Sequence, residues 1–542
     1  MKKLRYIGPF FRMNKLSPKE INGQLFHLSK EAIRTLVLES KCGIVDSIKN
    51  YKKTSSTIDI TTTSNFSPLL CMYRKSSPNY IHSKNYNGFD EDSFKKDISP
   101  ITNALMTANI INLSTYYSRF KDADEKLYTY SKVYKKLAKE QLNFYSEHLR
   151  NDEGVFVEKK NLAENNHKGF NLNDKSNKFK FSDQAFMMAS YNLYSEVFIN
   201  DEISNDYKNF SLEILHVLID FKEKIYESSF EEILKTLMAI NIFYTKSKND
   251  DAKILIIDLT DYLTNKFEEK NYYVDSLDFS SLFAINLILS YRNTNIITFK
   301  DKAKEIVKKL VSLYDNDKEV FLKLSSKKDL KYSSFDIVFY FLAIDLYSIE
   351  FKEENEYKNI ISSLYRKYFI NSGLITSWPE APTLDEAERY KGLTLKSEDM
   401  LEESFFRMPT TLTPLSLGIA PIFNRSINYS KKKDDFSVSS SSFDSFKNMY
   451  IYQSIIFLFK DEILRETTLT DKLKETTSKN INQISIKYSK KNINKVPVEK
   501  SEENITLNNN NNNNNNNNEI NLKNIDEEIL ETNDSIPSLI SP

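Results

Sequence analysis

The chain has few cysteine, histidine and glycine residues, and each shortage excludes a class of protein. Only Cys42 and Cys71 occur among 542 residues, too few for a disulfide framework or a cysteine-based zinc cluster. The five histidines, at positions 27, 82, 148, 167 and 216, do not group at ligand spacing. No glycine-rich phosphate loop, HExxH zinc motif or GxSxG nucleophile elbow is present. We therefore expect no metal ion and no cofactor.

The chain also lacks net charge and long apolar runs. Its 75 basic and 75 acidic side chains cancel, so no excess of cations favours nucleic acid as a partner. No apolar run approaches the ~20 residues that cross a bilayer, so no membrane partner is expected. The N-terminal residues lack a continuous apolar stretch and a small-residue cleavage site. These absences predict a cytoplasmic protein.

A recurring helix start is the clearest positive signal. Serine, an aromatic residue and an acid precede an apolar segment at Ser229-Phe230-Glu231, Ser334-Phe335-Asp336 and Ser442-Phe443-Asp444, with Phe181-Ser182-Asp183 as a permuted copy. An amide or acid follows at a constant spacing of nine positions, in the pairs Asp183 and Asn192, Glu232 and Asn241, Asp336 and Asp345, Asp444 and Gln453. The repeat predicts buried helices of one design, whose first residues cap free N–H groups.

Charged amphipathic segments alternate with these apolar ones. They are Asp124 to Arg150, Ser204 to Glu227, Asp250 to Glu269, Phe299 to Tyr314 and Glu354 to Phe369, and a segment near Ser29 to Cys42, ended by Gly43, supplies a sixth. Apolar residues at i, i+3, i+4 and i+7 give such helices one buried stripe. The alternation predicts an all-α fold, an (α/α)6 toroid of six helical hairpins. An open solenoid is the competing interpretation.

The pattern also predicts the domain organisation. Residues 1–99 form an N-terminal segment with one helix packing on the toroid, and residues 100–463 form the toroid. Residues 464–542, with an unbroken asparagine run at 508–518, lose apolar periodicity and are predicted to be a disordered tail.

The long connections all run from an outer helix to an inner one. They span Asn151 to Phe181, Asp315 to Ser333 and Asn371 to Ser441, so they emerge on one face, at the N-terminal ends of the inner helices. Long loops in a compact domain are usually functional. The sequence therefore predicts the working surface, a funnel on that face.

The repeated inner helices, together with loop starts such as Asn151-Asp152-Glu153-Gly154 and Asn371-Ser372-Gly373-Leu374, resemble the six-hairpin glycosidase-like superfamily over roughly residues 101–462. The resemblance implies a toroid whose funnel binds or converts a saccharide, as a hydrolase, lyase or epimerase would. It is one of architecture and transfers no catalytic motif.

Glycosyl transfer uses two carboxyl groups across a sugar ring, ~5 to 10 Å apart. We predict Asp183, Asp336 and Glu380 as catalytic candidates, since each would face the funnel. For the first two, helix capping is the competing role. The predicted ligand contacts are Trp378, Tyr390, Phe405 and Arg407, although Trp378 could instead plug the loop onto the core.

Two functions of different class remain open. One is a carbohydrate-active or carbohydrate-binding protein with a saccharide ligand. The other is a non-catalytic intracellular scaffold that binds a protein or peptide in the same funnel. Paired carboxylates from different hairpins would favour the first, and an apolar groove without such a pair would favour the second.

Overall fold

The computed structural model describes residues 17–51, 66–76, 80–83, 86–89, 94–163, 169–176, 178–325, 327–379, 421–440 and 443–460. Three predictions therefore concern residues that lie wholly or partly outside the described ones. They are the tail from 464 onward, most of the loop between 371 and 441, and four of its residues, Glu380, Tyr390, Phe405 and Arg407.

The apolar repeats form inner helices that are buried on almost every side. Every residue of α3 except Thr115 is buried. Burial on all sides follows from the sequence, because apolar residues occupy every face of these segments. In the described part of the chain the inner helices are α3 (Pro100–Tyr117), α5 (Phe181–Val197), α8 (Phe230–Ser247), α11 (Leu277–Thr294), α13 (Ser334–Glu350) and a helix over 445–460.

The amphipathic segments form outer helices that bury one stripe each. In α12 (Ile297–Val311) the buried residues Phe299, Ala303, Ile306, Val307 and Leu310 follow the helical period. The other outer helices are α2 (Pro18–Leu38), α4 (Glu125–His148), α6 (Ser204–Asp220) with the short α7 (Lys222–Tyr226), α9 (Asp250–Glu268), and α14 (Glu354–Leu364) continued by a π-helical turn (Tyr365–Ile370).

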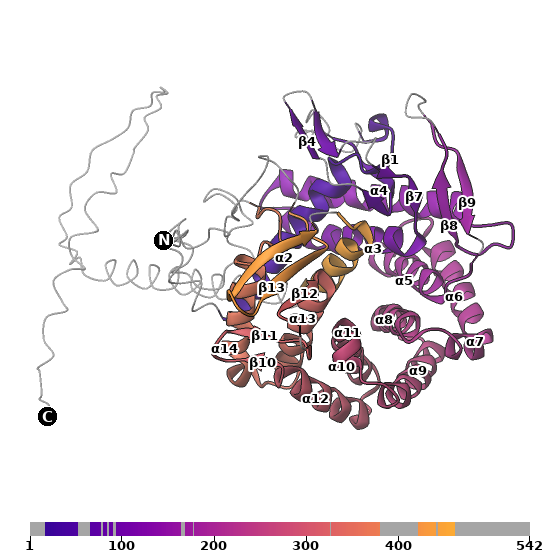
Figure 1. Ribbon diagram of the computed structural model, residues 1–542. Helices are drawn as coiled ribbons and strands as arrows, with labels where there is room; N and C mark the ends of the chain where they lie inside the picture. The colour runs from indigo at the N-terminus through magenta and orange to yellow at the C-terminus, as the bar shows by residue number, and fades with distance from the viewer. Residues whose placement is uncertain are drawn as a thin grey trace, which may run out of the picture. The chain divides into compact units, whose positions relative to one another are not determined.

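The inner helices close into a ring (Figure 1). Each of α3, α5, α8, α11 and α13 packs on the next. The helix over 445–460 contacts α13, where the rings of Phe339 and Tyr450 lie 5.5 Å apart. It also contacts α3, since Lys460 Nζ donates to Asn112 Oδ1 at 2.7 Å. The predicted all-α toroid of six hairpins is confirmed, and the open solenoid is excluded.

The short strands of the described residues lie in the connections that enter inner helices, which the sequence predicted to emerge on the funnel face. Their bounds are β1 (Gly43–Val45), β2 (Leu69–Met72), β3 (Lys75–Ser76), β4 (Tyr80–Ser83), β5 (Tyr86–Phe89), β6 (Phe94–Lys95), β7 (Asp97–Ile98), β8 (Glu158–Asn161), β9 (Leu172–Ser176), β10 (Tyr314–Asp315), β11 (Val320–Phe321), β12 (Asp329–Ser333), β13 (Ser426–Ser430) and β14 (Asp435–Ser440). The three-stranded sheets run β7-β8-β9 and β12-β13-β14, with antiparallel neighbours. Single helical turns occur at Ile48–Asn50, Ser118–Phe120 and α10 (Tyr272–Asp275).

The first helix differs from the expected segment near Ser29 to Cys42. It begins at Pro18, because Ser17 and Glu20 form a capping box with proline in the first turn. It ends at Leu38, and Gly43 lies in β1, where a Cβ atom would stand 1.8 Å from the Cys71 carbonyl oxygen. As an outer helix it reaches α13, since Asn22 Nδ2 donates to Asp345 Oδ2 at 2.8 Å.

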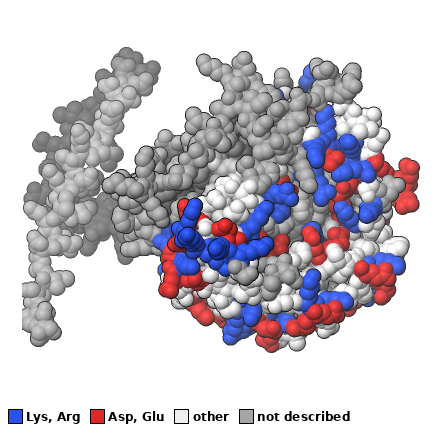
Figure 2. Space-filling model, viewed as in Figure 1, with Lys and Arg blue, Asp and Glu red and all other residues white. Residues whose placement is uncertain are grey.

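Among the described residues, no helix combines the length and apolarity needed to cross a membrane. On the face shown in Figure 2, basic and acidic side chains are intermixed.

Candidate functional site

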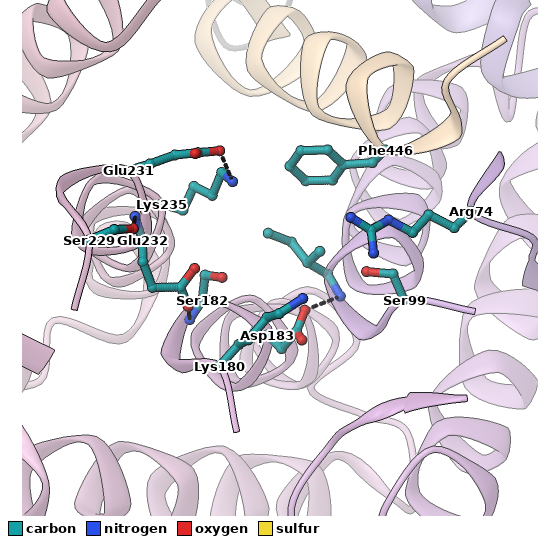
Figure 3. Close-up of a pocket in the computed structure, with 11 residues that line it drawn as sticks. Arg74, Ser99, Lys180, Ser182, Asp183, Ser229, Glu231, Glu232, Lys235 and Phe446 are labelled. Carbon is teal, nitrogen blue, oxygen red and sulfur yellow. Dashed lines mark hydrogen bonds and ion pairs between the residues drawn. The ribbon is translucent and has the colours of Figure 1, made fainter. Parts of the chain in front are cut away.

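A polar pocket lies where the N-terminal ends of α3, α5, α8 and the helix over 445–460 converge (Figure 3). Its volume is about 170 Å³. Most of its lining side chains are charged or carry a hydroxyl group. The lining residues are Arg74, Ser99, Ile101, Lys180, Ser182, Asp183, Ser229, Glu231, Glu232, Lys235 and Phe446. The pocket therefore opens at the end of the inner helices that the loop pattern predicted.

Asp183 lies on the floor of this pocket, in the first turn of α5, and is 1% exposed. Its Oδ1 accepts a hydrogen bond from the Ile101 backbone N–H at 3.0 Å. Pro100 has no N–H, so Ile101 carries the first free donor of α3. The other oxygen, Oδ2, has no hydrogen-bond partner among the described residues. Burial raises the pKa of Asp183 to about 7, so the carboxyl is partly protonated at neutral pH.

A second carboxyl group reaches the same floor from the next hairpin. Glu232, in the first turn of α8, accepts the Ser182 N–H at 2.9 Å and so caps the start of α5. It is a further cause of the raised pKa of Asp183. Beside it, Glu231 pairs with Lys235, whose ammonium lies 5.0 Å from the Phe446 ring centroid. Two neighbouring hairpins thus bring carboxyl groups to one pocket.

Two cations form the opposite wall. Arg74 Nη1 and Lys180 Nζ both donate to Glu158 Oε1, at 2.7 and 2.6 Å. Figure 3 shows the Arg74 guanidinium directed into the pocket beside Ser99. The cations lower the pKa of Glu158 against the effect of its burial, which keeps that carboxylate charged.

A second cluster of acidic side chains lies where α11 and α13 begin. Burial and the neighbouring Asp336 raise the pKa of Asp278 to about 6. Asp336 itself accepts from the Ser333 backbone N–H and from Lys323 Nζ, both at 2.7 Å. Burial lowers the pKa of Lys447, which faces these acids. This cluster holds acidic side chains from two hairpins, but none of them lines the pocket around Asp183.

The sequence-predicted residues divide between several places. Asp183 lines the pocket, whereas Asp336 closes a capping box with Ser333 and pairs with a lysine. Trp378 is half-buried against the core, edge-on to Tyr365 at 6.2 Å between ring centroids. Its indole N–H has no partner among the described residues.

Sequence reasoning missed the cationic wall. Arg74 belongs to the connection between α2 and α3, within the segment treated as an N-terminal addition. Its position in the sequence could have identified it. The connection that holds Arg74 runs from an outer to an inner helix, like the long connections that were assigned to the funnel face. Glu231 and Glu232 stood in the repeat but were interpreted only as part of a helix start.

Among the residues that the structure describes, no group of three or more His, Cys, Asp or Glu side chains could hold a metal ion. The fold and the pocket define a class, a toroid of six helical hairpins with a site lined by acidic and basic side chains at the N-terminal ends of its inner helices. This is the architecture that the resemblance to the six-hairpin glycosidase-like superfamily implied.

Comparison with known proteins gives structural overlaps but no sequence relative. No protein-family profile matches the chain, and no curated protein matches it in sequence. Solved structures that it overlaps include a D-mannose isomerase, with 10% identity, 76% of this chain and 96% of that chain covered, and a TM-score of 0.41. Cellobiose 2-epimerase from Spirochaeta thermophila overlaps with 9% identity, coverage of 81% and 98%, and a TM-score of 0.43. An endoglucanase from the termite Nasutitermes takasagoensis gives 10% identity, coverage of 81% and 98%, and a TM-score of 0.41.

Proposed function

We propose that the chain is a carbohydrate-active or carbohydrate-binding protein whose ligand occupies the pocket around Asp183. One observation carries the proposal. A buried carboxyl group, with a raised pKa and one oxygen that has no partner among the described residues, lines a pocket that a second carboxyl, from Glu232, also reaches. Buried acids that stay protonated near neutral pH supply the proton donor of glycoside chemistry.

The chemistry of the lining favours a saccharide over a peptide. Sugar hydroxyl groups both donate and accept, and here they would meet carboxylates, serine hydroxyls and cations, with Phe446 as an apolar face. A scaffold that binds a helix or an apolar peptide would need an apolar groove. Ile101 and Phe446 are the apolar members of this lining, so the scaffold alternative is the weaker one.

In this proposal Asp183 donates a proton to a ligand oxygen, and Glu232 or Glu231 accepts one on the other side of the ring.

Asp336 and Glu380 remain candidates for a second centre. Trp378, Tyr390, Phe405 and Arg407 remain proposed ligand contacts from the loop between 371 and 441. The cytoplasmic location also remains a proposal.

A panel of oligosaccharides, read by thermal shift on the full chain, tests the function. At least one saccharide should raise the melting temperature by mass action. Asp183→Asn should abolish any turnover while leaving the chain folded. If turnover is found, it should decline as pH rises above about 7, because Asp183 then loses the proton it must donate. A panel without any hit, together with tight binding of an apolar peptide, would favour the scaffold instead.

A further inference from the structure

We propose that the pocket selects an acidic saccharide, whose carboxylate binds between Arg74 and Lys180. This inference rests on the proposed function and adds the class of ligand. It starts from the two cations on one wall, which come from separate elements. Arg74 follows β2, and Lys180 immediately precedes α5.

The two cations keep donors available for a ligand. Among the described residues, the Arg74 side chain makes one polar bond, to Glu158, so its remaining N–H groups are not engaged. Lys180 likewise donates once, to the same oxygen. Their side chains are 32% and 38% exposed, so a ligand can reach them. An arginine fork beside a lysine is well suited to a carboxylate.

Charge around this wall also favours an anion. Arg74, Lys175 and Lys180 surround Glu158, and Lys175 lies 3.7 Å from its second oxygen. Lys175 also pairs with Asp97 at 2.6 Å, so three cations face two carboxylates. Asp183, the acid next to Lys180, is held partly neutral by burial and does not fully compensate them. This end of the pocket therefore attracts a negative group.

The opposite wall limits how much negative charge is accepted. Glu231 and Glu232 lie there, with Lys235 paired to the first. A doubly charged phosphate would be repelled by these acids more than a singly charged carboxylate would be. The pocket therefore orients a uronate, with its carboxylate toward Arg74 and its hydroxyl groups toward the glutamates.

The test compares ligands that differ only in whether their carboxyl groups carry charge. Tetramers of galacturonate, glucuronate and mannuronate are titrated calorimetrically into the full chain, each beside its fully methyl-esterified form. At least one acidic tetramer should bind on the order of tenfold tighter than its ester, a difference that shrinks at high salt. Arg74→Gln and Lys180→Gln should each remove most of that preference, and Arg74→Lys should retain part of it. Lys175→Gln is the matched control for the loss of one nearby charge, because Lys175 touches Glu158 without lining the pocket, and it should lower the preference less than either pocket variant.

The outcomes separate this inference from the proposed function. Equal affinity for acid and ester, or binding of neutral saccharides alone, would overturn the uronate preference and leave the saccharide function standing. A preference that survives in both glutamine variants, with melting temperatures matching the wild type, would overturn the assignment to these two cations. Failure of every saccharide, neutral and acidic, would overturn the proposed function and this inference with it.

Discussion

One position in the repeat, the acid in the first turn of an inner helix, has three different roles. Asp183, Glu232 and Asp336 each stand at the third residue of their helix. Asp336 caps its own helix with Ser333, whereas Glu232 and Asp183 bond N–H groups of the preceding inner helix. Of these three acids, only Asp183 is both buried and left with an oxygen that has no partner among the described residues. The surroundings of each acid, and not its place in the repeat, decide its role.

The buried carboxyl of Asp183 should cost the protein stability at high pH. Its folded pKa of about 7 lies above the 3.8 that is usual for an aspartate, so the folded state resists an ionisation that the unfolded state undergoes. The cost grows as pH rises from about 4 to about 7 and is constant above that range. Asp183→Asn keeps an acceptor for Ile101 and carries no charge. We expect this variant to gain stability relative to wild type as pH rises, by up to about 4 kcal/mol at pH 8.

Urea unfolding of the wild type and of Asp183→Asn, at pH 4.5 and at pH 8, measures how the stability difference between them changes with pH. Asp124→Asn is the control, because Asp124 caps α4 through Leu127 N–H and asparagine caps equally well. A stability difference for Asp183→Asn that does not change with pH would show that the carboxyl ionises as easily in the folded chain as in the unfolded one.

At the scale of elements, acids of one hairpin cap the helix of its neighbour. Glu232 on α8 caps α5, and Asp183 on α5 caps α3. The recurring amides bind across hairpins as well, since Asn241 donates to Ser290 and Asn286 donates to the Leu234 carbonyl. These bonds fix the rotation of adjacent inner helices and therefore the positions of the pocket side chains.

Removal of the cap from α5 should be measurable. We expect Glu232→Ala to lower the free energy of unfolding by about 1 kcal/mol, because the Ser182 N–H loses its acceptor. Glu231→Ala should change it by no more than about 0.5 kcal/mol, since Glu231 is 46% exposed and only pairs with Lys235. Equal losses in the two variants would mean that the neighbour-to-neighbour cap contributes nothing of its own.

The sequence predicted the elements better than the site. Apolar periodicity predicted the inner helices, and it predicted the bounds of five outer helices to within a few residues. The reason is that burial of a helix face directly requires this periodicity. The start of α2 was missed although Ser17-Pro18-Lys19-Glu20 carries a capping signal. Arg74 and Lys180 could not be brought together from sequence, because they lie on different connections, before α3 and before α5, and only the folded chain shows that β7 of the first pairs with β8 of the second.

At the scale of the whole molecule, the ring is complete within the described residues. The helix over 445–460 contacts both α13 and α3, so the chain beyond it is not needed for closure. We expect truncation after Thr470 to leave the melting temperature of the remainder nearly unchanged, as differential scanning calorimetry would measure. A drop of many degrees would show that residues past 470 pack on the toroid.

The central claim is that a saccharide binds at the N-terminal ends of the inner helices. Hydrogen–deuterium exchange of the full chain, with and without the best saccharide of the panel, tests it most directly. We expect slower exchange in peptides covering 99–104, 180–186 and 229–236, which carry the pocket. Peptides covering Asn112, Leu193 and Ile242, at the opposite ends of the same helices, should exchange at unchanged rates. Protection at those opposite ends, with none around Asp183, would contradict the account.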